Sequence, residues 1–427
     1  MKMDQKHPDQ EDKVDVDQQE DVIYSPDDVI EVIDLDDGSN ADVLSSEMAD
    51  VDIEESYDAD IDDVDGAMGG DDEESMEDLT DDSDLVLRKH QSNVFSVSID
   101  PATGTLGVTG GEDDKAYLWN LVEGTVMFEC TGHKDSVTCV GFNHDSTMVA
   151  TGDMSGLINV WRVQDGSSIW SFEASDLEWM EWHHSAPVLL AGTSDGMTWM
   201  WKVPSGELKT FQGPSCQATC GQWLPDGKRA CVGYDDGVVK IWDLKTGAGQ
   251  FTLSDGDAHK SSVTCLDCHH DNTLIATGST DVTCRLINSH NGKVLGIIDA
   301  GDQQQEGANA EDSIESVAFS PSLQLLATGS LNGMLGIWDV PTQVLRHNCK
   351  QTGIVKLKWD PTGPLVYTVS LDGLIRLWDG RSGNLASHWS GHHAEILDFD
   401  VSRDGSTLVT ASGDGSTRVF HMHRPDR

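Results

Sequence analysis

The sequence contains few basic residues: 27 Lys and Arg stand against 75 Asp and Glu, which gives a formal net charge of −48 at pH 7. A chain with this charge is repelled by nucleic acid and by anionic membrane surfaces. We therefore expect neither as a direct partner and expect a basic protein or another Lys/Arg-rich peptide instead. The acids are concentrated at the start, because residues 1–84 hold 34 Asp and Glu and only three lysines.

The sequence also lacks long apolar runs and paired cysteines. No run approaches the ~18 residues of a membrane-spanning helix, and the first residues, MKMDQKHPDQ, have no apolar signal segment. The nine cysteines are odd in number and scattered, which is typical of reduced thiols inside a folded body. These absences predict a cytoplasmic protein, with the nucleus as a second compartment.

Residues 1–83 are rich in Asp, Glu, Ser and Gln and nearly free of aromatic residues. Such a segment cannot bury enough apolar surface to offset its chain entropy, so we predict a disordered acidic tail. One stretch inside it, VIEVIDLDD from Val29 to Asp37, combines aliphatic pairs with acids. It resembles motifs that add a strand to a small ubiquitin-like modifier. The alternatives are incidental valines or a segment that docks on the chain's own folded body.

Residues 84–427 repeat with a period near forty. Fragments such as VTGGEDDKAYLWN, ATGSLNGMLGIWD and YTVSLDGLIRLWD align without gaps, and eight such units occur. Their last aromatic or aliphatic positions are 40 to 51 residues apart: Trp119, Trp161, Trp201, Trp242, Ile287, Trp338, Trp378 and Phe420. This period, with four short strands in each unit, is that of WD40 repeats. The body therefore resembles the WD-repeat β-propeller family throughout, and an all-β fold is predicted.

The number of blades follows from a shortage of strands at the end. After Phe420 only seven polar residues remain, too few for the outer strand of the last repeat. Residues 84–88 (DLVLR) precede the first repeat and have no other place to pair, so we predict that they complete the last blade and close the ring. Eight blades are expected, with seven as the alternative, in a single monomeric domain over residues 84–427.

In the WD-repeat family, a His, a Thr or Ser, an Asp and a Trp form a buried network within a blade. The first repeat matches fully with His90, Thr109, Asp113 and Trp119. In the second repeat we take Ser155 as the replacement of the Asp. Because the set recurs with the period of the fold, a structural role is favoured over catalysis. No catalytic constellation is found elsewhere, so the protein is predicted not to be an enzyme.

Two further motifs resemble known functional sites. Cys265-Leu266-Asp267-Cys268-His269 matches a haem-attachment pattern, but it falls on a predicted strand without a second pair of ligands, so we expect no metal and no cofactor. Trp378-Asp379-Gly380-Arg381 resembles the box with which some WD-repeat proteins bind the adaptor of a cullin–RING ubiquitin ligase.

The loops expected on one face of the propeller are acidic. A ring of carboxylates around a channel attracts Lys/Arg-rich segments. Glu178 and Glu315 occupy one equivalent repeat position near the channel mouth. The full set of predicted partner-binding residues is Glu112, Asp114, Asp176, Glu178, Asp235, Glu311, Asp312, Glu315 and Glu395.

The acidic leader with VIEVIDLDD, the LVLRKH segment and the order of strong and degenerate repeats resemble one branch of the family. This branch contains the angio-associated migratory cell protein and its fungal counterpart, a dedicated chaperone of a ribosomal protein. The resemblance implies capture of the basic N-terminal segment of newly made ribosomal protein L-ten (universal L-sixteen) for assembly of the large subunit. The alternatives are a substrate receptor of a cullin–RING ligase and a general signalling or migration scaffold.

Overall fold

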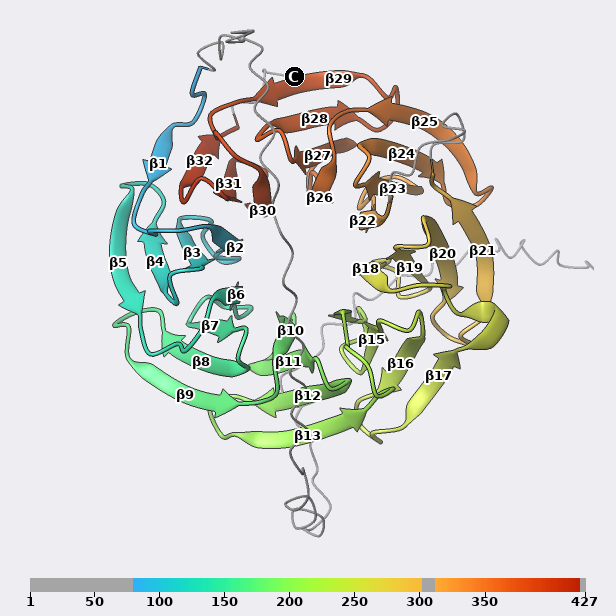
Figure 1. The fold of residues 1–427 in the computed structure, drawn as a ribbon, viewed down its shortest axis with the longest axis horizontal. Coiled ribbons are helices and arrows are strands. Elements are labelled where there is room, and N and C mark those ends of the chain that lie inside the picture. Colours follow the sequence, from blue (N-terminus) through green and yellow to red (C-terminus); the bar gives the residue numbers. More distant parts are fainter. Residues whose placement is uncertain (1–79, 302–311, 423–427) are drawn as a thin grey trace, which may run out of the picture.

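The computed structural model describes residues 80–301 and 312–422. In this part the chain forms eight four-stranded antiparallel sheets arranged as blades around a central channel (Figure 1). The predicted eight-bladed all-β propeller is confirmed. The described residues contain one 3-10 turn, η2 (Asp255–Asp257), and no helix among them is long and apolar enough to cross a membrane.

Within a blade the strands run from the channel to the rim, and we call them the inner, second, third and outer strand. Blade one contains β2 (Val94–Ile99), β3 (Leu106–Gly111), β4 (Ala116–Asn120) and β5 (Thr125–Cys130). Blade two contains β6 (Val137–Phe142), β7 (Met148–Asp153), β8 (Leu157–Arg162) and β9 (Ser168–Glu173). Blade three contains β10 (Leu177–Trp182), β11 (Val188–Thr193), β12 (Met197–Lys202) and β13 (Glu207–Gln212). Blade four contains β14 (Cys220–Trp223), β15 (Arg229–Gly233), β16 (Val239–Asp243) and β17 (Gly249–Leu253).

The second half repeats this order. Blade five contains β18 (Val263–Cys268), β19 (Leu274–Ser279), β20 (Thr283–Asn288) and β21 (Val294–Asp299). Blade six contains β22 (Ile314–Phe319), β23 (Leu325–Ser330), β24 (Met334–Asp339) and β25 (Val344–Lys350). Blade seven contains β26 (Ile354–Trp359), β27 (Leu365–Ser370), β28 (Ile375–Asp379) and β29 (Leu385–Trp389). Blade eight contains β30 (Ile396–Val401), β31 (Thr407–Ser412), β32 (Thr417–His421) and β1 (Leu85–Leu87).

Two sets of loops share one face of the ring, which we call the upper face. In every blade a residue at most two positions after the second strand donates its backbone N–H to a carbonyl within the last three residues before the inner strand. Examples are Glu112 to Asn93 (2.9 Å), Ser194 to Asp176 (2.9 Å) and Asp235 to Gln217 (3.0 Å). The loop that enters a blade and the turn between its second and third strands are therefore held side by side.

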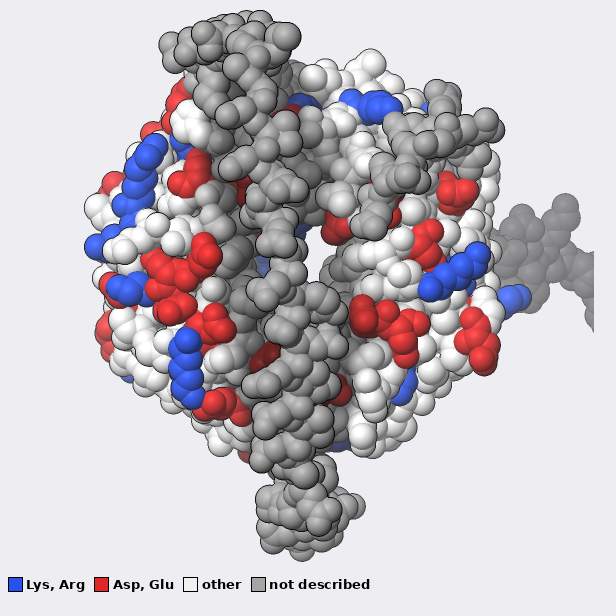
Figure 2. All heavy atoms as spheres, viewed as in Figure 1, with Lys and Arg blue, Asp and Glu red and all other residues white. Residues whose placement is uncertain are grey.

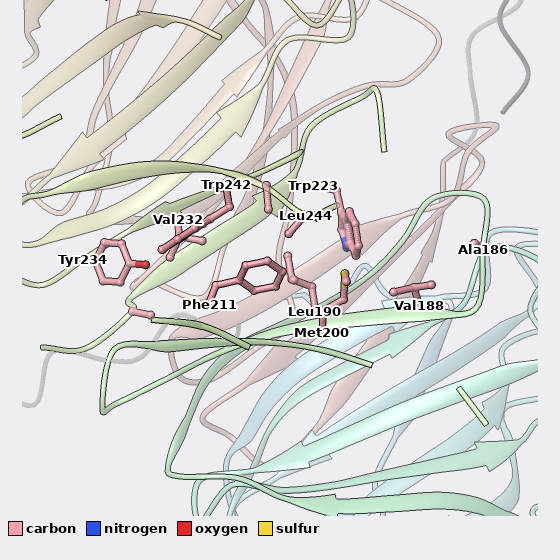
Figure 3. Close-up of a cluster of buried hydrophobic side chains, with 12 residues drawn as sticks. Ala186, Val188, Leu190, Met200, Phe211, Trp223, Val232, Tyr234, Trp242 and Leu244 are labelled. Carbon is pink, nitrogen blue, oxygen red and sulfur yellow. The ribbon is translucent and has the colours of Figure 1, made fainter. Parts of the chain in front are cut away.

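The hydrophobic core lies between neighbouring blades. The second strands are almost wholly buried, as in β11 and β23, whereas the outer strands alternate between buried and exposed residues. Figure 3 shows the cluster between blades three and four, where Leu190, Met200 and Phe211 pack against Val232 and Trp242. These two blades lack the His and Thr of the buried network, so aliphatic and aromatic packing stabilises them instead.

The ring is closed as predicted by the segment before the first repeat. β1 pairs antiparallel with β32, with Leu85 opposite Val419 and Leu87 opposite Thr417. Leu87 is buried, in a cluster that joins blades eight and one. Gly124 lies over β1 with φ +67°, and its α-carbon faces Leu85 and Leu87, so the left-handed turn that glycine permits brings blade one against the closing strand.

The residues before β1 also hold the closure. The Asp82 N–H donates to the Ser390 carbonyl (3.0 Å), and the Asp82 side chain accepts the Ser390 N–H (2.8 Å). Asp81 accepts hydrogen bonds from the guanidinium of Arg418, which is fully buried in blade eight. Residues 80–84 therefore connect the end of blade seven to the third strand of blade eight.

Inner strands of neighbouring blades are linked through side chains rather than through a shared sheet. Asp398 and Asp400 of β30 accept the backbone N–H groups of Val97 (2.9 Å) and Ile99 (2.8 Å) in β2. On the other side, Lys358 of β26 donates to Asp400 (2.8 Å). These contacts complete the inner wall where the two ends of the repeat array meet.

This closure predicts opposite outcomes for two deletions. Removing residues 1–79 should leave a protein that unfolds cooperatively, because all contacts of residues 80–84 and of β1 remain. Removing residues 1–88 exposes the edge of β32 and the cluster around Leu87, so the melting temperature should fall and aggregation should begin at lower temperature. Calorimetry and light scattering measure both effects. Identical melting of the two proteins would contradict the closure.

Candidate peptide-binding face

The predicted His–Thr–Asp–Trp network of blade one is present. His90 Nδ1 lies 2.8 Å from Asp113 Oδ1, and His90 Nε2 lies 2.8 Å from Thr109 Oγ1. Trp119 Nε1 donates to Thr109 Oγ1 at 2.9 Å. Burial lowers the pKa of His90, so the imidazole is neutral at pH 7 and joins the loop to the sheet. Every polar atom of the set has a partner inside the blade, as a structural role requires.

The prediction for the second blade is wrong in one residue. Ser155 does not replace the Asp, because Asp153 supplies the carboxylate from the last position of β7, 3.1 Å from His133 Nδ1. Ser155 instead donates its hydroxyl to Asp153 (2.7 Å). Burial opposes the charge of Asp153, but hydrogen bonds from His133, the Lys134 amide and Ser155 lower its pKa to about 2. A carboxylate two residues earlier reaches the same imidazole because it lies at the strand end rather than in the turn.

The predicted partner-binding acids lie in the loops and strand starts of the upper face, except Glu311, which lies outside the described residues. Glu112, Asp114, Asp176 and Asp235 are exposed, and Glu178, Asp312, Glu315 and Glu395 are partly buried. Figure 2 shows a face of the ring on which several separate groups of Asp and Glu side chains lie on both sides of the central opening, with fewer Lys and Arg side chains among them.

Three of these acids form a group at the entrance of blades three and four. Asp176 ends the loop into β10, Glu178 is the second residue of β10, and Asp235 follows β15. Burial raises the pKa of Glu178, and the negative charges of Asp176 and Asp235 raise it further. A hydrogen bond with the Gln217 side chain, in the loop before β14, opposes this rise in the pKa. A cationic side chain placed among them would relieve their mutual repulsion.

Glu315 lies deeper than this group. It is the second residue of β22, the position that Glu178 takes in β10, and it lines the central channel. Ser313 donates its hydroxyl to Glu315, which orients the carboxylate. Asp312 accepts the backbone N–H groups of Ser313 (2.9 Å) and Asn332 (3.1 Å), so part of its charge serves the local turn.

The remaining predicted acids surround the opening in blades one and eight. Glu112 and Asp114 belong to the turn between β3 and β4, and Asp114 has φ +58°. Glu395 directly precedes β30, at the position of Asp176 in blade three. The structure thus distributes carboxylates around the upper face and concentrates them at blades three, four and six.

Two acids inside the channel were missed from the sequence. Glu181 of β10 and Asp267 of β18 line a hollow of about 520 Å³ in the channel wall. Burial raises the pKa of Glu181 to about 8, opposed by the hydrogen bond from the Trp223 N–H and increased by the charge of Asp267. Burial raises the pKa of Asp267 to about 6, although the Phe319 N–H donates to it. Each is the fifth residue of its inner strand, a position that faces the channel. This shared position is the sequence signal that could have identified them.

The opposite wall carries the cations of the channel. Lys356 and Lys358 of β26 point toward Asp398 and Asp400 of β30, and both form ion pairs there. Two lysines are thus neutralised by acids of the next blade, whereas among the described residues no Lys or Arg forms an ion pair with Glu181 or Asp267. Glu181, with its raised pKa, is protonated at pH 7, so the negative charge on this side of the channel comes from Asp267 and from the acids of the upper face.

The two other motifs have ordinary surroundings. Cys265 and Cys268 are free thiols in β18, and burial raises the pKa of each well above its usual value. In residues 80–301 and 312–422, no group of three or more His, Cys, Asp or Glu side chains could hold a metal ion. Arg381 is exposed and bonded to Asp379 (2.8 Å), so the ligase-adaptor interpretation of this box stays a prediction.

The buried carboxyl of Glu181 predicts a pH dependence of stability. Its pKa is raised on folding from an unfolded value near 4.5 to about 8, so the folded state binds more protons between these values. Stability from this group is complete below pH 4.5 and is lost as the pH rises toward 8, by at most about 1.4 kcal/mol per pH unit.

We expect Glu181→Gln to remove this slope, because the amide oxygen still accepts the Trp223 N–H without carrying charge. Unfolding by urea at pH 6 and pH 8 should show the variant gaining stability relative to wild type at the higher pH. An equal difference in unfolding free energy between the variant and the wild type at both pH values would show that Glu181 is ionised at both.

The repeat and the closure define the class: a WD-repeat β-propeller, here with an acidic upper face. The WD domain, G-beta repeat model matches residues 83–120, 124–162 and 205–243, and the model of the nucleolar protein 10-like N-terminal domain matches residues 237–423. The human angio-associated migratory cell protein is 51% identical over 419 residues, 95% of each chain. The chain belongs to the family of that protein.

Two more distant similarities concern ribosome assembly. The ribosome assembly protein SQT1 of Saccharomyces cerevisiae is 24% identical over 84% of this chain and 91% of its own length. The crystal structure of Chaetomium thermophilum Sqt1 bound to the N-terminus of the ribosomal protein L10 superimposes with a TM-score of 0.73 at 22% identity. The superposition covers 80% of this chain and all of the solved chain, and it shows that the two proteins share the propeller fold.

Proposed function

We propose that this protein is a non-enzymatic chaperone that holds a Lys/Arg-rich segment of a newly made large-subunit ribosomal protein on its upper face. The observation that carries the proposal is the group of Asp176, Glu178 and Asp235 at the channel entrance, with Glu315 in the channel wall. The relation to a ribosome assembly protein, and a fold shared with Sqt1 bound to the L10 N-terminus, support this choice of client.

The physical basis of the proposal is the electrostatic repulsion among these carboxylates. Exposed single ion pairs contribute only ~0–1 kcal/mol each. Glu178 is partly buried and its pKa is already raised by its neighbours, so a guanidinium or ammonium group there gains from several carboxylates at once. A basic ribosomal segment shielded in this way cannot make nonspecific contacts with RNA before assembly. We place this capture in the cytoplasm, with the nucleus as a second compartment.

The proposal predicts the effect of reversing two charges. Glu178→Lys together with Glu315→Lys should weaken binding of an N-terminal L10 peptide by at least tenfold, or about 1.4 kcal/mol. Binding to the wild type should also weaken steeply as salt is raised, because the charges are screened. Calorimetry with the full-length protein measures both.

The matched control is Glu123→Lys with Glu129→Lys, which makes the same change of net charge on the outer part of blade one. Near-wild-type affinity is expected there. Equal loss in both variants would mean that only net charge matters, and loss of binding only after deletion of residues 1–79 would transfer the function to the leader.

A further inference from the structure

The second residue of the inner strand changes from acidic to aliphatic between blades six and eight. It is Glu315 in β22, Val355 in β26 and Leu397 in β30. These strands are neighbours around the channel (Figure 1), and the three side chains are partly buried and line the same hollow of about 520 Å³. This volume lies in the range of protein ligand pockets. We call these three residues the mixed wall, because a carboxylate and two aliphatic side chains follow one another at one level of the channel.

Aliphatic side chains also occupy the upper turns of blades six and seven. The residue that is Asp235 in blade four is Leu331 in blade six and Leu371 in blade seven, since all three make the same backbone hydrogen bond to the loop before their inner strand. Leu331 is 38% exposed and Leu371 is 44% exposed. They lie close together, because a Cβ added at Gly353 would be 2.4 Å from the Leu331 carbonyl oxygen and 2.8 Å from Leu371 Cδ1. Gly353 is two residues before Val355, so both leucines border the loop that leads to the mixed wall.

The charged groups inside the hollow are satisfied by the chain itself. Lys356 and Lys358 form ion pairs with acids of β30. Asp267 accepts the Phe319 N–H (2.7 Å). Burial raises the pKa of Glu181 to about 8, so this carboxyl group is neutral at pH 7. An apolar side chain that enters the hollow therefore separates no ion from its partner.

A segment that crosses the channel opening meets two kinds of surface. The acids at the entrance of blades three and four lie on one side of the opening, and the mixed wall of blades six to eight lies on the other (Figure 1). A purely basic segment would leave the aliphatic part of the wall in contact with water. A purely apolar segment would leave the carboxylates repelling one another. A segment with both kinds of residue complements both sides.

We propose that the mixed wall selects client segments in which an aliphatic or aromatic residue lies beside Lys or Arg. This inference rests on the proposed function, because it concerns the same segment on the same face. The basic residues lie against the acids of blades three and four and against Glu315, and the apolar side chain enters the hollow against Val355 and Leu397.

Calorimetry of the full-length protein with three synthetic peptides tests the inference. The peptides contain the same flanking Lys and Arg residues and differ only at the central position, which is Phe, Ser or Lys. The Phe peptide should bind at least about tenfold more tightly than the Ser peptide, because burial of the ring adds affinity that the ion pairs do not supply. The Lys peptide should bind more weakly than the Phe peptide, although it carries one more positive charge.

A double variant locates the preference in the hollow. With Val355→Ser and Leu397→Ser, the Phe and Ser peptides should bind equally. The matched control, Val344→Ser with Leu345→Ser, makes the same two changes at exposed positions of β25 and should keep the preference of the wild type. If the first variant does not fold, a peptide with a central benzoylphenylalanine locates the side chain on the wild type. Its crosslink should fall in β22, β26 or β30.

Four results would overturn the inference. Equal binding of the Phe and Ser peptides to the wild type would do so and leave the proposed function intact. Tighter binding of the Lys peptide than of the Phe peptide would mean that the hollow takes a cation. A preference that survives in the Val355 and Leu397 variant, or a crosslink outside the three strands, would place the apolar side chain elsewhere. If none of the peptides binds, the inference and the proposed function fail together.

Discussion

The propeller depends on the junction between its last and first blades. All other neighbouring blades are joined directly by the chain, whereas these two are not. Three contacts made by distant parts of the sequence close it. β1 pairs with β32, Asp398 and Asp400 accept N–H groups of β2, and residues 80–84 bridge blades seven and eight. At every other boundary a connecting loop keeps the two neighbouring blades together. Cooperative unfolding of the whole ring therefore depends on the boundary between blades eight and one.

A closed ring gives its carboxylates two different tasks. Asp113 and Asp153 accept hydrogen bonds from histidines and backbone N–H groups inside their blades. Asp398 and Asp400 form ion pairs with lysines and accept N–H groups of the neighbouring inner strand. At the entrance of blades three and four, burial and the charges of Asp176 and Asp235 raise the pKa of Glu178, and a hydrogen bond with the Gln217 side chain only opposes this rise. Acids of the second kind are the ones available to a basic ligand.

The sequence predicted the number of blades because the Trp positions recur with the period of the fold, and it predicted β1 because the last repeat lacks an outer strand. It also placed Glu178 and Glu315 at one equivalent position. The prediction that Ser155 replaces the Asp is wrong because the carboxylate of Asp153 reaches His133 from a strand end that alignment does not mark. Glu181 and Asp267 were missed because strand alternation alone does not tell which side faces the channel.

The central claim is that the upper face, and not the leader, holds a basic segment. Hydrogen exchange of the full-length protein with and without an N-terminal L10 peptide tests it most directly. The peptide should slow exchange in the loop before β10, in the turn after β15 and at the start of β22, around Asp176, Asp235 and Glu315. Slowed exchange confined to residues 1–79, with these three regions unchanged, would contradict it.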